Sequence, residues 1–351
     1  MKALFATAPW TVECRDNAEP TGSNPSAVRV GFETGLVAAG TLRILRGKIT
    51  DAVSKNFTYP IILGASGLGR VMDDSADGQF RAGDRVAINN VVTCGQCRFC
   101  LSGRDNLCAN GQLSGIDLDG TFRDVVAVAG KRLIRVPDTL DHRLGVMGTE
   151  IAVLVRALRL GRAELGNVGR VAVVGAGSLG AHAVQLARHF DAETVYAADV
   201  DESRVEIART LGASLAATPE VLADWIDEDP LTRAPNVTLV VTDHPDAIST
   251  AIRITAARGC VVCIGLPDGD RGILKAFYPN VIKKELTLRG CYAKSADDLA
   301  RTFALISDST YRVIEDFVEI PLSAEGAEFM SKEAVNWPDG KRYVIRNVSR
   351  P

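Results

Sequence analysis

The fold of this chain is decided by the segment RVAVVGAGSLGAHAVQLARHF, residues 170–190. An apolar run, 171–174, leads into three glycines, Gly175, Gly177 and Gly180, and the residues after them contain no helix breaker. A short apolar run before a glycine-rich turn is typical of a buried strand, and a longer run without Gly or Pro favours a helix. The segment therefore predicts a strand, a tight turn and a helix in direct succession.

The glycines follow the pattern G-x-G-x-x-G, which suits a dinucleotide. The first glycine permits the tight turn, the second lets the backbone approach a pyrophosphate, and the third lets the helix pack on the strand. Free N–H groups at the start of the helix favour the phosphates. The alternative is a glycine-rich turn with no nucleotide, but strand, glycines and helix coincide here with a well-placed acid. The predicted cofactor contacts in the turn are Gly175, Gly177, Ser178, Leu179 and Gly180.

The acid is Asp199, which ends the next predicted strand, 194–200, about 20 residues after the glycines. A carboxylate at this position accepts hydrogen bonds from the adenosine ribose hydroxyls and repels a 2′-phosphate. Arg204 follows closely and is expected to flank the ribose or the adenine. The sequence therefore predicts NAD(H) rather than NADP(H), with Asp199 and Arg204 among its contacts.

From residue 151 onward, predicted strands and helices alternate. One predicted helix spans 203–213, with Ser203 and Glu206 placed as a capping box and Gly212 as a stop signal. Alternation of this kind implies a parallel sheet wrapped by helices. The fold class is therefore α/β, with residues 151–293 as a doubly wound nucleotide-binding domain of the Rossmann type.

The first 150 residues have a different texture, with short alternating runs such as 27–34, 83–92 and 122–130 between turns. Such runs read as strands, so a β-rich unit is expected over 1–150. Residues 294–351 end in two further predicted strands and are expected to return to this unit.

Four cysteines, Cys94, Cys97, Cys100 and Cys108, stand close together in a lobe over 90–112. Four thiolates at this spacing can surround one tetrahedral zinc ion, and a closed four-sulfur site leaves no coordination position for substrate. The sequence predicts one structural zinc ion per chain. The other four cysteines read as small apolar residues, because a chain without a secretion signal is expected in a reducing compartment.

Composition excludes several classes of function. The chain has 351 residues, enough for two domains, and its 46% hydrophobic and 24% charged content is ordinary for a soluble protein. A net charge of -3 gives no electrostatic case for nucleic acid or an anionic membrane. Neither a signal peptide nor a transmembrane run is evident. We expect a cytoplasmic protein with a small-molecule substrate.

Several stretches together resemble the medium-chain dehydrogenase/reductase superfamily, in its zinc-type alcohol and polyol dehydrogenase branch. They are MKAL, TLRILRGK, YPIILGASGLGRV, GDRVAINNVVTCGQCRFCLSG, GAGSLG and GCVVCIGLP. The resemblance implies that 1–150 is a GroES-like catalytic domain, rejoined by 294–351. It also implies hydride transfer at a cleft between this domain and the nucleotide-binding domain, with Leu266 beside the nicotinamide. A homodimer or homotetramer is expected, as in many relatives.

The chain departs from this family where the catalytic zinc would bind. A Cys ligand is replaced by Ala38 and a proton-relaying Ser or Thr by Gly40. The family's Gly-His-Glu becomes Gly-Ala-Ser at 64–66, and the third ligand falls on Thr149. No histidine precedes His142, whereas an open zinc site usually takes at least one histidine. We expect no catalytic zinc.

Other groups must then stabilise the developing oxyanion or move a proton, as hydrogen-bond donors and side-chain acids can. Glu150 in an apolar site would have a raised pKa and could act as an acid or base. A surface charge at Arg43, a small loop residue at Ser66 and an ion pair at Glu150 are the structural alternatives. The candidate catalytic residues are Thr41, Arg43, Ser66, Thr149 and Glu150.

The leading hypothesis is an NAD(H)-dependent oxidoreductase acting on a small polar carbonyl or alcohol. Three alternatives stay open. The first is a metal-free reductase of a conjugated C=C bond, and the second is a redox-neutral epimerase that retains NAD. The third is a non-catalytic nucleotide-binding relative, although an intact cofactor fingerprint favours redox use.

Overall fold

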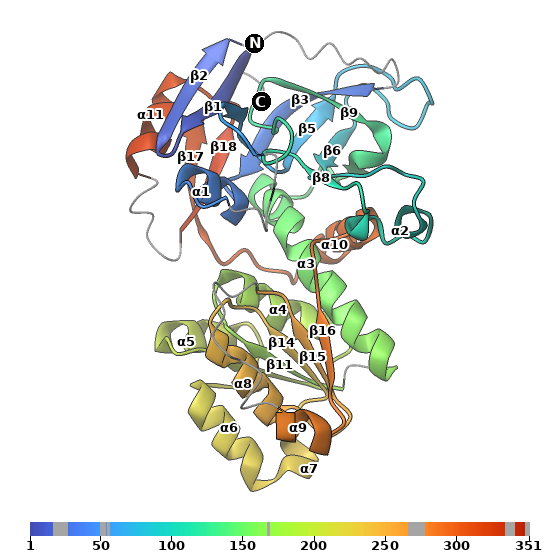
Figure 1. Ribbon diagram of the computed structural model, residues 1–351, viewed down its shortest axis with the longest axis vertical. Helices are drawn as coiled ribbons and strands as arrows, with labels where there is room; N and C mark the ends of the chain where they lie inside the picture. Colours follow the sequence, from blue (N-terminus) through green and yellow to red (C-terminus); the bar gives the residue numbers. More distant parts are fainter. Residues whose placement is uncertain are drawn as a thin grey trace. The chain divides into compact units, whose positions relative to one another are not determined.

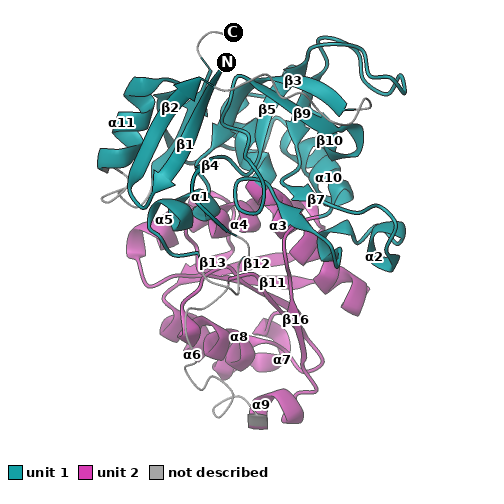
Figure 2. Ribbon diagram, turned by 45° about the horizontal axis from the view of Figure 1, so that its top comes forward, with its two compact units in different colours: residues 1–149, 295–351 teal, residues 150–294 magenta. Residues whose placement is uncertain are grey.

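The computed structural model describes residues 1–16, 27–49, 54, 57–166, 169–265, 278–333 and 341–347. The chain forms two compact units, unit 1 of residues 1–149 with 295–351 and unit 2 of residues 150–294 (Figure 2). It passes from one unit to the other twice, after Thr149 and after Lys294.

Unit 1 is rich in β-structure, and its strands are β1 (Lys2–Ala8), β2 (Thr11–Asp16), β3 (Ala27–Leu36), β4 (Ile61–Ile62), β5 (Gly67–Val71), β6 (Arg85–Ile88), β7 (Val91–Val92), β8 (Gln112–Leu113), β9 (Val125–Ala129), β10 (Leu133–Arg135), β17 (Asp316–Pro321) and β18 (Lys341–Arg346). Within the described residues, the largest sheet has the order β10-β6-β5-β3-β18-β17, and β9 also pairs with β3. A second sheet has the order β2-β1-β4, and β7 pairs with β8. The last strands of the chain therefore complete the sheet that its first third begins.

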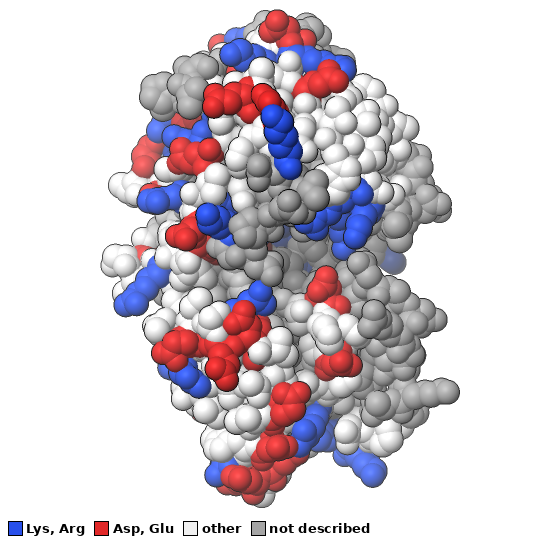
Figure 3. Space-filling model, turned by 90° about the vertical axis from the view of Figure 1, so that its left-hand side faces the viewer, with Lys and Arg blue, Asp and Glu red and all other residues white. Residues whose placement is uncertain are grey.

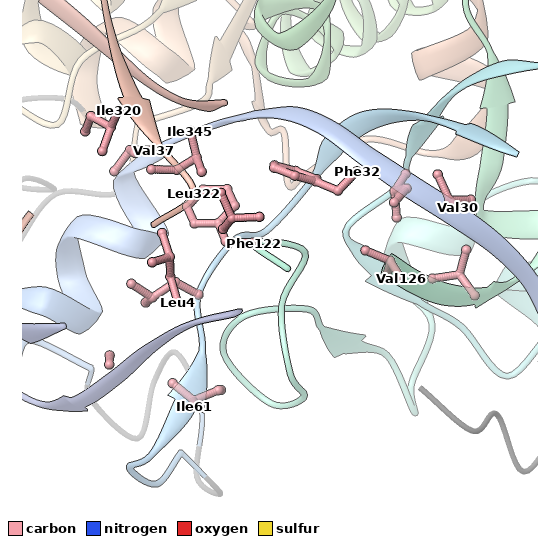
Figure 4. Close-up of a cluster of buried hydrophobic side chains, with 14 of the residues drawn as sticks. Leu4, Val30, Phe32, Val37, Ile61, Phe122, Val126, Ile320, Leu322 and Ile345 are labelled. Carbon is pink, nitrogen blue, oxygen red and sulfur yellow. The ribbon is translucent and has the colours of Figure 1, made fainter. Parts of the chain in front are cut away.

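The core of unit 1 is a cluster of apolar side chains contributed by several strands (Figure 4). The rings of Phe32 on β3 and Phe122 lie 6.0 Å apart between centroids. Both side chains are fully buried, which contributes about 1.5–3 kcal/mol each. A Cβ atom at Gly64 would lie 2.5 Å from the Phe122 ring, and the backbone there has φ 100°. Only glycine fits the approach of this loop to Phe122.

Unit 2 contains a parallel sheet, and its strands are β11 (Arg170–Val174), β12 (Thr194–Ala198), β13 (Leu215–Ala217), β14 (Val237–Val240), β15 (Cys260–Cys263) and β16 (Thr287–Gly290). Their order in the described residues is β13-β12-β11-β14-β15-β16 (Figure 1). In register, Val173 of β11 pairs with Ala197 on one side and Leu239 on the other. The sheet is the doubly wound α/β fold that the alternating pattern predicted, so the predicted fold class is confirmed.

Helices cover both faces of this sheet: α4 (Ser178–His189), α5 (Glu202–Thr210), α6 (Pro219–Glu228), α7 (Pro230–Arg233), α8 (Pro245–Ile254), α9 (Tyr278–Lys283) and the part of α3 (His142–Leu165) that begins at Glu150. Apolar residues of α6 and α8, among them Leu222 and Ile252, form one core with the sheet residues Val174 and Val261. Burial of the apolar sides of these helices is what holds them on the sheet.

The predicted capping box of α5 is wrong. The helix begins at Glu202, and its N-cap is Asp201, whose carboxylate accepts the backbone N–H of Ser203 at 2.8 Å. The Ser203 hydroxyl also donates to this carboxylate, at 2.6 Å, so it does not cap from its own position. Asp and Ser are comparably strong N-caps, and two such residues lie near the helix start. The predicted stop at Gly212 lies just after the helix, with φ 101°.

Several other helices differ from expectation. Helix α3 begins at His142 rather than at residue 151, because Val146 and Met147 in its first turns are buried in the core. The sequence also did not predict five short helices, which are α1 (Ala39–Leu45), α2 (Arg98–Leu101), α7, α9 and α11 (Ala324–Glu333). Short helices depend on tertiary packing rather than on propensity, and sequence patterns detect them poorly.

Helix α10 (Ala296–Ile306) belongs to unit 1 and starts directly after the second crossing. Its N-cap is Ser295, which forms a capping box with Asp298. The Asp298 carboxylate accepts the Ser295 backbone N–H at 3.0 Å and the Ser295 hydroxyl at 2.8 Å. All of these groups are buried, so the box defines where α10 begins.

No helix among the described residues is long and apolar enough to cross a membrane. Basic and acidic side chains of the described residues are mixed on the face drawn in Figure 3.

We expect Asp298→Ala to lower the free energy of unfolding by about 1–3 kcal/mol, because it leaves the buried Ser295 N–H without its acceptor. The matched control is Asp297→Ala, which removes an exposed pair with Arg301 on the same turn and should cost less than about 0.5 kcal/mol. Urea unfolding followed by circular dichroism measures both. Equal effects of the two variants would contradict the structural role of the capping box.

Candidate functional site

The four clustered cysteines of the lobe converge on one point. Their Sγ atoms all lie within 4.8 Å of one another, with Cys97 to Cys100 at 3.5 Å and Cys94 to Cys108 at 3.5 Å. Tetrahedral zinc with Zn–S bonds of about 2.3 Å separates its sulfur ligands by about 3.8 Å. The donor set and the spacing therefore fit one zinc ion held by four thiolates.

The backbone around these cysteines favours thiolates. The N–H of Gln96 lowers the pKa of Cys94, and the N–H of Cys100 lowers the pKa of Cys97 to about 6. Gly95, with φ 77°, makes the turn that directs such N–H groups at sulfur. Thiolates are the form that binds metal, so the loop is prepared for an ion before one arrives.

The cysteine lobe also makes hydrogen bonds to parts of unit 1 that are distant in the sequence. Lys131 donates to the carbonyl oxygen of Thr93 at 2.6 Å. Asp105 lies in the segment between the short helix α2 (Arg98–Leu101) and Cys108. Its carboxylate accepts the backbone N–H of Ala296 at 3.4 Å. Burial raises the pKa of Asp105, and the Ala296 N–H opposes this rise. The lobe therefore braces the start of α10.

The glycine-rich turn lies between β11 and α4, and its three glycines differ in the space around them and in backbone conformation. A Cβ at Gly180 would lie 1.9 Å from the carbonyl oxygen of Gly175, so helix and turn are in direct contact. Gly175 itself has φ 93°. A Cβ at Gly177 would meet no atom within 4 Å, so the second glycine faces open space. Ser178 and Leu179 are the first, half-buried residues of α4.

Asp199 directly follows β12 and is held by the backbone. The N–H of Ala176 donates to its Oδ2 at 2.8 Å, and the N–H of Asp201 donates to its Oδ1 at 3.0 Å. Arg204 Nη1 lies 3.8 Å from the same Oδ1. A carboxylate has about four acceptor positions, so lone pairs remain for the hydroxyls of a ribose. The predicted pair of Asp199 and Arg204 therefore lies together, beside the glycine-rich turn.

Beyond the turn, the carboxyl ends of β14 and β15 lie against each other. A Cβ at Gly265 would lie 1.9 Å from the carbonyl oxygen of Thr242. His244 caps α8, with its Nδ1 accepting the N–H of Asp246 at 3.4 Å. The role of this histidine in the structure is therefore that of the N-cap of α8. The predicted cofactor contact Leu266 lies outside the described residues.

Two of the predicted catalytic residues meet in unit 1. The Ser66 hydroxyl donates to the Thr149 hydroxyl at 3.0 Å, and Thr149 donates to the carbonyl oxygen of Val146 at 2.8 Å. Thr121, which the sequence analysis missed, donates to the carbonyl oxygen of Ser66 at 3.0 Å. Ser66 and Thr149 are both buried. The arrangement offers hydroxyl groups, which can hold an oxygen atom but are poor zinc ligands.

Comparison with known proteins shows the family. The family model described as "Alcohol dehydrogenase GroES-like domain" matches residues 24–138, and the one described as "Zinc-binding dehydrogenase" matches residues 178–308. An L-threonine 3-dehydrogenase of Shewanella baltica strain OS155 is 30% identical over 244 residues, covering 68% of this chain and 70% of that protein. This chain belongs to the zinc-type alcohol dehydrogenase branch of the medium-chain dehydrogenase/reductase superfamily. The resemblance found in the sequence is thereby confirmed.

Solved structures agree in fold with this dehydrogenase. The L-idonate 5-dehydrogenase of Escherichia coli superposes with a TM-score of 0.84 at 21% identity, covering 98% of this chain and 97% of that one. The galactitol-1-phosphate dehydrogenase of Escherichia coli also has a TM-score of 0.84, at 20% identity, with coverage of 99% and 100%. Membership of the family makes the chain an NAD-dependent dehydrogenase, and an enzyme is what the sequence predicted.

The hydrogen bonds described for the hydroxyl pair do not include the three remaining predicted catalytic residues, although Glu150 directly follows Thr149 in the chain. Thr41 and Arg43 belong to α1, where Thr41 is buried and Arg43 is a half-buried residue of the last turn. Glu150 is half-buried on α3 and is the first residue of unit 2. Their catalytic roles remain predictions.

Sequence reasoning missed Lys294, the last residue of unit 2. Burial lowers its pKa to about 8, and the charge of Glu150 opposes this shift. Its signal in the sequence is a lysine after the predicted strand 285–293, which one sequence cannot distinguish from a surface charge. Lys294 is therefore a titratable group with a perturbed pKa beside a predicted catalytic acid.

Two glycine variants separate folding from cofactor binding. Gly180→Ala forces a Cβ into the Gly175 carbonyl and should lower Tm. Gly177→Ala adds a Cβ where the protein has open space, so Tm should stay close to the parent value. The added methyl would occupy the space of the pyrophosphate, so NADH affinity should fall at least about tenfold. Fluorescence titration with NADH and thermal melting measure the two effects. Unchanged affinity in Gly177→Ala would remove this glycine from the cofactor contacts.

Proposed function

We propose that this dehydrogenase transfers hydride between NAD(H) and a small polar carbonyl or alcohol substrate without a catalytic zinc. The observation that carries the proposal is the set of side chains at the aligned ligand positions. Ala38 and Ala65 offer only methyl groups, and Thr149 is engaged with Ser66 at 3.0 Å. A catalytic zinc takes His, Cys or carboxylate ligands, and these three positions supply none of them.

The residues of unit 2 suit the cofactor. When bound, the nicotinamide supplies or accepts the hydride. Gly177 leaves space for the phosphates at the start of α4, where backbone N–H groups have no partner within the helix. Asp199, held by the Ala176 N–H, would accept from the ribose hydroxyls and repel a 2′-phosphate. These features support NAD(H) over NADP(H).

The hydroxyl groups of unit 1 suit a substrate oxygen. Ser66 and Thr149 are buried and already oriented by Val146 and Thr121. An oxygen that becomes negative during hydride transfer would accept the Ser66 hydroxyl in place of the Thr149 hydroxyl. Donors that are oriented in advance stabilise such an oxyanion without reorganisation.

The relatives support a polar alcohol as the substrate class. Their names refer to L-threonine, L-idonate and galactitol 1-phosphate, which all carry hydroxyl groups. We infer one structural zinc per chain at the four cysteines, which stay reduced in the cytoplasm. We also propose a homodimer or homotetramer, because β16 is the last strand of the described sheet and leaves an edge for pairing.

Metal analysis tests the proposal directly. We expect about one zinc per chain in the parent, none in Cys97→Ser and one in the control Cys14→Ser. The parent should oxidise L-threonine or galactitol 1-phosphate with NAD⁺, or reduce dihydroxyacetone with NADH, at a rate that added zinc and a phenanthroline chelator leave unchanged. Two zinc ions per chain, or activity that depends on added zinc, would contradict the metal-free site. Turnover of cyclohexenone alone would favour the reduction of a conjugated C=C bond instead.

Asp199→Gly tests the choice of cofactor. We expect NADH affinity to fall about tenfold or more and the preference over NADPH to shrink, because the variant loses ribose acceptors and a charge that repels phosphate. Glu220→Ala, which removes an exposed negative charge on α6, is the control and should bind both cofactors as the parent does. Tighter binding of NADPH than NADH by the parent would refute the argument.

A further inference from the structure

Strand β16 runs along α3 in the opposite direction, and two sets of contacts define this register within unit 2 (Figure 1). At one end, Arg289 pairs with Glu164 at 2.8 Å. At the other end, the Cys291 thiol donates to the carbonyl oxygen of Val153 at 3.5 Å. Three residues further along the strand direction comes Lys294, and one helical turn before Val153 comes Glu150. Lys294 and Glu150 therefore come next at the same end of this pairing, and the charge of Glu150 acts on the Lys294 ammonium group.

The chain turns sharply to present Lys294. Ala293 has φ 50°, in the left-handed region that residues other than glycine rarely adopt. Such strain persists where the surrounding structure requires it, and it is common at functional sites. Lys294 itself is half-buried, and the charged group that faces it across the register is Glu150.

Lys294 also lies at the edge of the sheet where ligands bind. It follows β16, so it shares the carboxyl edge with the glycine-rich turn after β11 and with Asp199 after β12. A dinucleotide crosses this edge where the strand order reverses, between β11 and β14. Because Asp199 on the β12 side suits the adenosine ribose, the nicotinamide half is directed toward β14, β15 and β16. Lys294 is on that side.

We propose that Lys294 donates a proton to the substrate oxygen during reduction and accepts one during oxidation, and that Glu150 is the positioning residue that maintains its charge. This inference rests on the proposed function and supplies the proton transfer that a metal-free site requires. It also changes the role of Glu150, from the acid expected in the sequence analysis to the partner of the acid.

The proposed step balances. In reduction, hydride and its electron pair leave NADH and form a C–H bond at the carbonyl carbon. The C=O π pair moves to oxygen, and an O–H bond forms with a proton from the Lys294 ammonium group. The products are an alcohol, NAD⁺ and neutral Lys294, which regains a proton from water. Oxidation reverses each transfer, with neutral Lys294 as the base.

The electrostatics suit this role. Burial lowers the pKa of Lys294 to about 8, and Glu150 keeps it from falling further. A group that titrates close to the working pH transfers protons well in both directions. Reduction needs the ammonium form, so its kcat/KM should fall as the pH rises through about 8. Oxidation needs the neutral amine, so its kcat/KM should rise through the same range and then level off.

A labelling experiment tests the pair without any substrate. Acetic anhydride modifies neutral amines, and peptide mass spectrometry gives the extent of modification at each pH, with exposed Lys48 as an internal standard. We expect Lys294 to become reactive at a lower pH than Lys48, and Glu150→Gln to lower that pH further. A Lys294 profile that matches Lys48 and does not respond to Glu150→Gln would overturn the proposal.

Kinetic variants test the proton transfer, with the alcohol of highest kcat/KM among those named above. Lys294→Met and Lys294→Arg should both lower kcat/KM about 10²–10⁴-fold, because Met carries no proton and Arg does not release one. Glu150→Gln should retain more activity and shift the pH profile downward. Parent-like NADH affinity and Tm in Lys294→Arg would show that the fold is intact.

Lys284→Met is the matched control. Lys284 precedes the other end of β16, donates to the carbonyl oxygens of Arg253 and Thr255, and also has a pKa lowered by burial. Its loss should leave the pH profile unchanged. A Lys294→Met enzyme within twofold of a zinc-independent parent would overturn the Lys294 role while leaving the proposed function intact. A parent without turnover would contradict the proposed function, and the labelling profile would then still decide whether the pair exists.

Discussion

The parallel direction of the strands in unit 2 is the constraint on which the rest of the candidate site depends. Parallel strands end at a common edge, so the segments after β11, β12, β14 and β16 are brought together although they are far apart in the sequence. The glycine-rich turn, Asp199, Thr242 and Lys294 all follow such strand ends. The positions of the predicted cofactor contacts and of the proposed proton donor are therefore consequences of one pairing pattern.

Unit 1 contributes chemistry of a different kind. At the positions of the proposed metal-free site, this chain has the methyl groups of Ala38 and Ala65 and a chain of hydrogen bonds from Ser66 through Thr149 to Val146. Buried hydroxyls are costly unless they are paired, and here each has a partner. The four cysteines of the lobe suit a zinc ion whose coordination shell they would close, and Asp105 of the same lobe supports α10. Metal binding at the cysteines would thus stabilise the fold, and the proposed reaction would depend on organic side chains.

Sequence patterns correctly predicted the elements that have a strong local signal. The strand before Gly175, the helix after it and the acid at Asp199 were found because steric and electrostatic demands concentrate in a few adjacent residues. Weaker local signals gave the wrong N-cap for α5 and the wrong first residue for α3. Asp201 rather than Ser203 caps α5, and α3 extends back to His142 because its first turns are buried. Such outcomes depend on packing partners that lie far away in the sequence.

The sequence by itself determined the α/β class, the four-cysteine cluster that fits a zinc ion and the glycine-rich turn between strand and helix, because each requires only neighbouring residues of particular shape or chemistry. Only the tertiary structure decided which polar groups share a site. Ser66 meets Thr149 through the packing of unit 1, and Lys294 meets Glu150 because β16 lies antiparallel along α3. These pairs join residues from distant segments, so the hydrogen bond from Ser66 to Thr149 and the lowered pKa of Lys294 arise from burial and proximity that no local pattern encodes.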